Sequence, residues 1–103
     1  MDFVAIDFET ANSFRGSACE LALVRVSGGR VVETFETLLN QEEFTEFNTS
    51  LHGITPKMVE GSPKIKDIWP AAREFIGNNP IVAHYAAFDT GVLRDSLGLN
   101  AFS

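Results

Sequence analysis

Short apolar runs separated by polar turns make up the N-terminal part of the chain. The run Phe3–Phe8 leads into a polar loop, Ala11–Ser17, which is followed by two runs rich in β-branched residues, Leu21–Val26 and Val31–Leu39. Between these two runs lies Ser27–Arg30, and its central Gly-Gly pair is a strong signal for a tight hairpin turn. The pattern predicts three strands that form an antiparallel meander.

The spacing of apolar residues becomes helical further along the chain. The pair Thr55–Pro56 is typical of an N-cap followed by proline at the first helical position, with Gly61 as the stop. A second helix is expected to begin at Asp67, to hold Pro70 in its first turn and to end at Gly77. The apolar face of this second helix repeats at helical spacing and consists of Ile68, Trp69, Ala72, Phe75 and Ile76.

A short strand and a third helix are expected after this second helix. Asn78–Pro80 is typical of a turn, Ile81–His84 of a short buried strand, and Phe88–Leu97 of a helix capped by Gly98. Because helices alternate with strands in this part of the sequence, the pattern indicates the α/β class.

Size and charge narrow the possible functions. With 103 residues, the chain is long enough for one domain and too short for two. Its net charge of −6 and its pI of about 4.7 argue against a broad basic surface that binds long nucleic acids. A small site where metal ions meet one or two phosphates is compatible with this balance.

Cysteine content and the N-terminal sequence predict a cytoplasmic protein. Cys19 is the single cysteine, so no internal disulfide can form, and a reducing compartment fits. The first residues contain no basic segment and no long apolar run. We therefore expect neither a signal peptide nor a membrane-spanning helix.

Two carboxylates end the first predicted strand. Asp7 and Glu9 point to the same face, because successive side chains on a strand alternate, while Ile6 and Phe8 point to the other face. Neighbouring carboxylates repel each other, and a hard divalent cation such as Mg²⁺ or Mn²⁺ is the usual partner for such oxygens. The simpler alternative is a strand end that runs into a polar loop.

A third carboxylate and two histidines form a second group of candidates. Asp89 falls in the first turn of the last predicted helix, where the helix dipole favours negative charge, so a plain capping role also explains it. His84 ends the strand before that helix, and His52 lies in a predicted loop. A structural role is the simpler explanation of each histidine, and only the order of all these segments along the chain points to a function.

This order resembles the DnaQ-like exonucleases, the DEDDh branch of a superfamily that includes the proofreading epsilon subunit of DNA polymerase III. The first motif of the family resembles Asp7–Thr10, and the second resembles His84–Asp89. Leu51–Thr55 is similar to a family loop near the bound 3′ end. The resemblance extends from Phe3 to about Leu97.

The resemblance implies a ribonuclease H-like fold: a mixed sheet, built from the meander and a parallel strand, with flanking helices. It also implies hydrolysis of phosphodiester bonds at nucleic-acid 3′ ends by a two-metal mechanism, with two Mg²⁺ or Mn²⁺ ions in a complete site. In that case Asp7 would bridge both metals, Glu9 would bind the metal that activates water, and Asp89 would act on the second metal.

The family further implies a pocket for the terminal nucleotide. Apolar and aromatic walls suit an unstacked terminal base. The expected partner is the 3′ end of a single-stranded nucleic acid, DNA in preference to RNA, and no membrane. The residues implied for this substrate pocket are Thr10, His52, Ile54, His84, Tyr85 and Phe88.

Several features depart from the family pattern. Ala11–Asn12 stands where many relatives have glycine, and Tyr85 where they often have asparagine, which indicates a side branch of the family. After Asp89 the sequence has no histidine followed five residues later by aspartate, the motif that supplies the general base and the last carboxylate. Residues 1–103 are therefore expected to be the N-terminal portion of a single exonuclease domain, inactive by itself and incomplete at its C-terminal side.

Two alternatives stay open at this point. The chain could be a non-catalytic module that binds nucleic acid or protein on the same fold. It could also belong to an oligomer in which another chain covers an open sheet edge, because the strand Ile81–His84 would lack an outer neighbour. Self-association through that edge is expected in either case.

Overall fold

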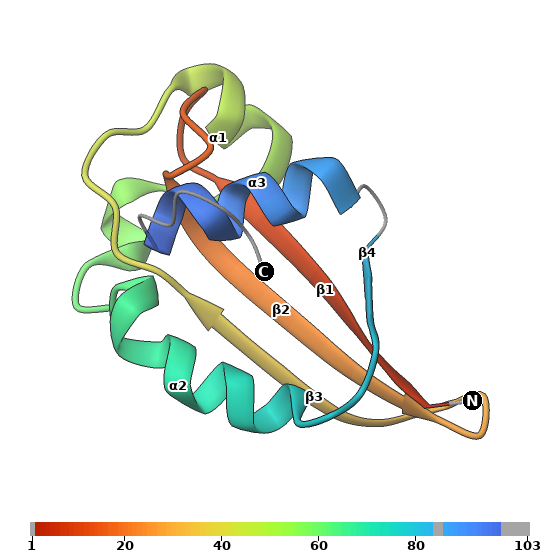
Figure 1. Ribbon diagram of the computed structural model, residues 1–103. Coiled ribbons are helices and arrows are strands. Elements are labelled where there is room, and N and C mark those ends of the chain that lie inside the picture. The colour runs from red at the N-terminus through yellow and green to blue at the C-terminus, as the bar shows by residue number, and fades with distance from the viewer. Residues whose placement is uncertain (1, 84–85, 98–103) are drawn as a thin grey trace.

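The computed structural model describes residues 2–83 and 86–97. Within them, four strands form one sheet in the order β3-β2-β1-β4 (Figure 1). β2 is antiparallel to both of its neighbours, whereas β4 is parallel to β1, which confirms the mixed sheet predicted from the sequence. In chain order the elements are β1 (Phe3–Thr10), β2 (Ala18–Ser27), β3 (Arg30–Leu38), α1 (Glu46–His52), the 3₁₀ helix η1 (Pro56–Val59), α2 (Ile65–Ile76), β4 (Ile81–Ala83) and α3 (Ala86–Leu97).

The meander is built around the predicted glycine turn. Ser27 pairs with Arg30, so Gly28 and Gly29 alone make the connection between β2 and β3. Their φ angles are 58° and 78°, in the left-handed region that a side chain disfavours. A two-residue turn with two positive φ angles matches the twist of the flanking strands, and this explains why the hairpin could be predicted from sequence.

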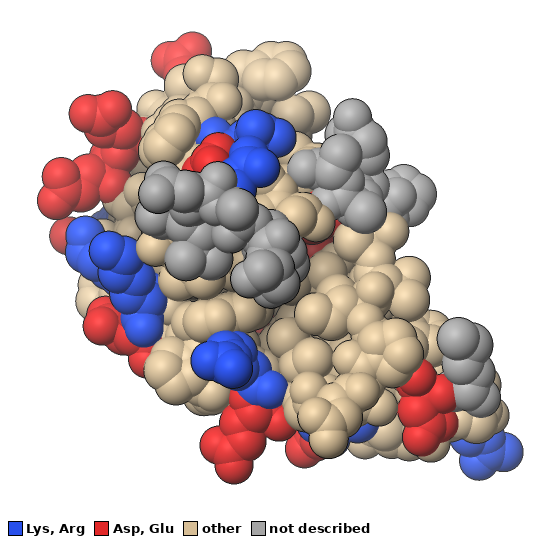
Figure 2. All heavy atoms as spheres, viewed as in Figure 1, with Lys and Arg blue, Asp and Glu red and all other residues tan. Residues whose placement is uncertain are grey.

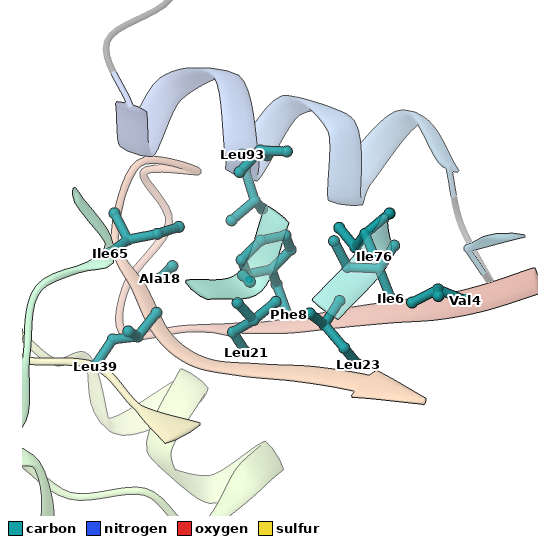
Figure 3. Packing of buried hydrophobic residues seen from close by; sticks show 12 residues of the cluster. Val4, Ile6, Phe8, Ala18, Leu21, Leu23, Leu39, Ile65, Ile76 and Leu93 are labelled. Atoms are coloured by element: carbon teal, nitrogen blue, oxygen red, sulfur yellow. The ribbon is translucent and has the colours of Figure 1, made fainter. Parts of the chain in front are cut away.

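The main core lies between one face of the sheet and helices α2 and α3, which both cover that face (Figure 1). Alternate residues of β1 point into it, namely Val4, Ile6 and Phe8. They pack with Leu23 from β2 and Leu93 from α3, as Figure 3 shows. Because side chains alternate along a strand, this packing turns the residues between them toward the opposite face.

Helix α2 begins earlier than the sequence pattern indicates. Its N-cap is Lys64, and Asp67 occupies the third helical position, where its carboxylate accepts a hydrogen bond from the Lys64 backbone N–H at 3.3 Å. The expectation of a start at Asp67 was wrong because a carboxylate satisfies free N–H groups from this position as well as from the cap itself. Pro70 consequently lies in the second turn of the helix, and the end at Gly77 is confirmed.

Helix α1 occupies a segment where the sequence pattern predicts a loop. Thr45 caps it by accepting the Asn48 N–H, and Gly53 ends it with φ 75°. The helix predicted from Thr55 is the single 3₁₀ turn η1, which Thr55 does cap. Among the described residues, no helix is long and apolar enough to cross a membrane.

Strand β4 is an edge strand rather than a buried one. The side chains of Ile81 and Val82 are each 47% exposed, because α2 and α3 leave the outer edge of the sheet uncovered. The strand is described as far as Ala83, and the predicted strand end at His84 and helix cap at Gly98 lie outside the described residues.

Candidate active site

Two carboxylates project from the C-terminal half of β1. Asp7 is exposed and Glu9 is half-buried. Ile6, which precedes Asp7, and Phe8, which lies between the two carboxylates, are buried in the core. The prediction that Asp7 and Glu9 share one face is therefore confirmed. The alternation of the strand, fixed by its apolar face, places both carboxylates where solvent and a ligand can reach them.

Helix α3 brings the third predicted carboxylate to the same place. Asp89 lies in its first turn and is only 4% exposed. Its Oδ1 atom accepts a hydrogen bond from the backbone N–H of Phe8 at 3.2 Å. This contact fixes the start of α3 against the strand that carries Asp7 and Glu9.

The three carboxylates border one cavity of about 370 Å³. None of the described residues that line it is a lysine or an arginine. On the face drawn in Figure 2, basic side chains are scattered among acidic ones and form no broad basic surface. The cavity is lined by Asp7, Phe8, Glu9, Thr10, Asn48, Leu51, His52, Phe88 and Asp89.

Burial and electrostatic repulsion in this cavity both act on the pKa of Glu9. Burial raises the pKa of the Glu9 carboxyl, and the nearby charges of Asp7 and Asp89 raise it further, whereas His52 acts in the opposite direction. The pKa of Glu20, the cross-strand neighbour of Glu9 on β2, is also raised, first by burial and then by Glu36 and the two β1 carboxylates. Negative charge therefore accumulates at this end of the sheet.

The donor set fits a hard divalent cation by its chemistry. Carboxylate oxygens are the ligands that Mg²⁺ and Mn²⁺ prefer, and an ion between Asp7 and Glu9 would relieve their repulsion. In residues 2–83 and 86–97, however, no three His, Cys, Asp or Glu side chains are already arranged to hold an ion. Binding would thus have to draw Asp89 and the β1 carboxylates closer together.

His52 contacts the backbone through both ring nitrogens. Nε2 lies 2.8 Å from the Thr10 carbonyl oxygen, and Nδ1 accepts the Ile54 N–H at 3.0 Å. A carbonyl can only accept and an N–H can only donate, so the proton is on Nε2. His52 therefore connects α1 to the end of β1, and neither ring nitrogen is left to take a proton from a substrate.

Only some of the residues predicted to contact the substrate line the cavity. Thr10 and Phe88 line the cavity, as the family resemblance implies. Ile54 does not line it and is instead 4% exposed in a small second core with Cys19 and Val59. His84 and Tyr85 lie outside the described residues.

Of the cavity residues, Asn48 is not singled out by the sequence pattern, and Leu51 enters only as the first residue of the family-like segment Leu51–Thr55. Both belong to α1, and Leu51 is 69% exposed at the cavity. A signal was present: Asn48 and His52 are four residues apart, which places them on one face of a helix. Because no helix is expected in this segment, the spacing of Asn48 and His52 does not by itself identify them as a pair.

Comparison with known proteins gives a consistent result. A family model described as "Exonuclease" (RNase_T) matches residues 4–101. The DNA polymerase III subunit epsilon of Aquifex aeolicus is 40% identical over 91 residues, which cover 84% of this chain and 45% of that protein. A PolC-type DNA polymerase III of Clostridium perfringens is 34% identical over 99 residues, 93% of this chain and 7% of that protein. The chain thus spans less than half the length of either relative.

A solved structure shows the same arrangement of elements. Exonuclease X, in complex with 5′ overhanging duplex DNA, superimposes with a TM-score of 0.76 and 32% sequence identity. The match covers 87% of this chain and 52% of that chain. The similarity includes the four-stranded mixed sheet that positions the carboxylates.

Proposed function

Because this chain belongs to the RNase_T family of exonucleases, we propose that its carboxylate cavity receives the 3′ end of a nucleic acid strand and takes part in 3′–5′ hydrolysis. The observation that carries the proposal is the convergence of Asp7, Glu9 and Asp89, from two elements far apart in the sequence, on one cavity. Membership in the family supports a nuclease activity. The 3′–5′ direction of the hydrolysis is part of our proposal.

Asp7, Glu9 and Asp89 would hold the divalent ions, Mg²⁺ or Mn²⁺, two of them in a complete site. Such ions, when bound, stabilise the attacking and leaving oxygens of the displacement at phosphorus. The chain itself contributes the fixed geometry of Asp7 and Glu9 on β1. The hydrogen bond from Phe8 N–H holds the Asp89 carboxylate beside them.

The terminal nucleotide would lie between α1 and the start of α3. Leu51 and Phe88 border the cavity on these two sides and offer apolar surface to a base, while Thr10 lies at its floor. His84 and Tyr85 stay candidates for substrate contacts because they immediately precede α3 in the sequence. His52 would shape this pocket through its contacts with the backbone.

DNA is the proposed substrate in preference to RNA. One relative is a subunit of DNA polymerase III, the other is a PolC-type DNA polymerase III, and the similar solved structure is a complex with DNA. We place the activity in the cytoplasm, a compartment that would hold such a substrate and that keeps a lone thiol such as that of Cys19 reduced.

The general base of the reaction would come from elsewhere than His52, whose two ring nitrogens are both engaged with the backbone. We propose that residues 1–103 are the N-terminal portion of a single exonuclease domain. The match to about half of the epsilon subunit and of exonuclease X supports this. The 103 residues by themselves would then bind metal weakly and cleave little.

Calorimetric titration with Mn²⁺ tests the metal site directly. The chain should bind Mn²⁺, and the double variant Asp7→Asn, Glu9→Gln should not. Glu74→Gln, which removes an exposed carboxylate of α2, is the matched control and should bind like the unmodified chain. Equal binding by the double variant and the unmodified chain would refute the site.

Cleavage of a 5′-labelled single-stranded DNA oligonucleotide in Mn²⁺ tests the activity. We expect little product with the 103-residue chain and a ladder of products shortened from the 3′ end with a chain extended along its natural reading frame. Absence of cleavage by the extended chain, with Mn²⁺ bound, would favour the non-catalytic module on the same fold.

A further inference from the structure

Strand β1 loses its neighbour at the point where the carboxylates begin. β4 pairs only with Val4, Ala5 and Ile6. The Val4 N–H donates to the Pro80 carbonyl on that side at 2.9 Å. Because the N–H and C=O groups of a strand point alternately to its two edges, those of Phe8 and Thr10 face the same edge, beyond the described end of β4.

Side chains from two helices take the place of the missing strand. The Phe8 N–H donates to Asp89 of α3. The Thr10 carbonyl accepts from His52 Nε2 at 2.8 Å and from Asn48 Nδ2 at 3.1 Å, both from α1. On the edge that faces β4, the stretch of β1 that carries the carboxylates is therefore held by these side chains, while its other edge pairs with β2.

Asn48 makes more of these contacts than any other described residue of α1. Its Nδ2 group also lies 3.3 Å from Thr10 Oγ1 and donates to the Asn12 carbonyl at 3.1 Å. Its Oδ1 accepts from the Thr45 hydroxyl at 2.8 Å, and this contact fixes the orientation of the amide. The half-buried amide thus joins the helix cap to the segment that follows Glu9.

On the other edge, the pairing of β1 with β2 is regular as far as Glu9 and becomes irregular just after it. Glu9 pairs with Glu20, but Thr10 pairs with Ala18, so the register of β1 and β2 shifts between Glu9 and Thr10. Such a bulge interrupts the ladder and redirects the side chains next to it. The backbone on the C-terminal side of Glu9 therefore depends, beyond the β2 ladder, on the contacts that hold Thr10.

We propose that Asn48 is a positioning residue of the carboxylate cavity: by donating to Thr10 and Asn12 across the bulge, it sets the direction of Glu9 for cation binding. This inference rests on the proposed function for the identity of the ligand. Asn48 touches neither the ion nor the substrate in this role, and it acts through the backbone that it fixes.

The first test measures the geometry without any metal. The Nε2–H proton of His52, hydrogen-bonded to the same Thr10 carbonyl, should give a slowly exchanging imidazole signal in ¹⁵N NMR spectra. Asn48→Ala should speed its exchange by about tenfold, because the carbonyl is no longer fixed. Asn48→Asp, which keeps the size but lacks the N–H donors, should do the same and serves if the alanine variant does not fold.

Ser50→Gly is the matched control. Ser50 is exposed on the same helix, and among the described residues its hydroxyl donates to the Phe47 carbonyl alone. Glycine there weakens the helix without touching β1. If Ser50→Gly speeds the His52 exchange as much as Asn48→Ala does, the contact merely stabilises α1 and the proposal fails.

The second test measures Mn²⁺ affinity by calorimetry at a temperature where all variants are folded. Asn48→Ala should weaken binding by on the order of tenfold, as substitutions behind a metal ligand commonly do, and Ser50→Gly should leave it unchanged. Unchanged affinity in Asn48→Ala would overturn the proposal. If the unmodified chain binds no Mn²⁺, it is the proposed function that fails, and the His52 signal alone decides whether Asn48 positions Thr10.

Discussion

Asp89 accepts a hydrogen bond from the backbone N–H of Phe8, a residue 81 positions earlier in the chain. The contact is buried, so its loss leaves a donor without a partner. Asp89→Ala should lower the free energy of unfolding by about 1–3 kcal/mol. Chemical denaturation followed by circular dichroism measures the change.

Asp7→Ala should affect stability much less than Asp89→Ala does, although both residues line the cavity. Asp7 is exposed, and its removal relieves repulsion of Glu9. We expect a change in the free energy of unfolding within about 0.5 kcal/mol of zero. Similar losses in Asp7→Ala and Asp89→Ala would mean that the contact with Phe8 contributes nothing to stability.

Glu9→Gln should stabilise the metal-free protein in a pH-dependent way. The pKa of Glu9 is raised above its usual 4.5 in the folded state, first by burial, so ionisation costs stability as the pH rises through this value. Glutamine removes that cost. The gain in melting temperature should be full at pH 7 and should vanish below pH 4.5, where the glutamate is protonated in both states. A gain of equal size at both pH values would contradict this assignment.

Cys19 should be inert toward thiol reagents in the native protein. Its side chain is fully buried, and burial, followed by the charges of Glu9 and Glu20, raises its pKa to about 12. Labelling with iodoacetamide at pH 8, followed by mass spectrometry, should show negligible modification without denaturant and complete modification in urea. Rapid labelling of the folded chain would show that this core opens readily.

Association through the β4 edge should depend on Val82. An edge strand with exposed apolar side chains is a template for pairing with another chain, and a lysine there prevents it. Val82→Lys should lower the average mass seen by light scattering across a concentration series. Val32→Lys, at the opposite edge on β3 and 55% exposed in the parent, is the matched control. A monomer at all concentrations, even without substitution, would refute association.

The meander and the pair of β1 carboxylates could be predicted because local signals specify them. Period-two alternation defines the faces of β1, and Gly28–Gly29 defines the turn. Helix α1 could not be found in this way, since none of its seven residues is buried and its two apolar residues, Phe47 and Leu51, are 71% and 69% exposed. Its position depends on the cap at Thr45 and on contacts of Asn48 and His52 with distant backbone.

The role of His52 likewise depends on tertiary structure. The sequence places it beside Gly53 and Ile54 in a family-like segment, which implies contact with substrate. Only the fold shows that the carbonyl of Thr10, 42 positions away, occupies its Nε2. For the same reason, the exposure of Ile81 and Val82 depends on which edge the helices leave open.

The parallel pairing of β4 with β1 also determines when the site can form. Ser27 meets Arg30 within a single turn, whereas Val4 meets Ile81 only after residues 5–80, which lie between them, have been made. Contacts of such long sequence separation close late in folding, because loop entropy must be lost first. Asp7 and Glu9 are therefore neighbours from the earliest stage, and Asp89 joins them last. During synthesis, a nascent chain therefore holds Asp7 and Glu9 in place well before Asp89 can complete the border of the cavity.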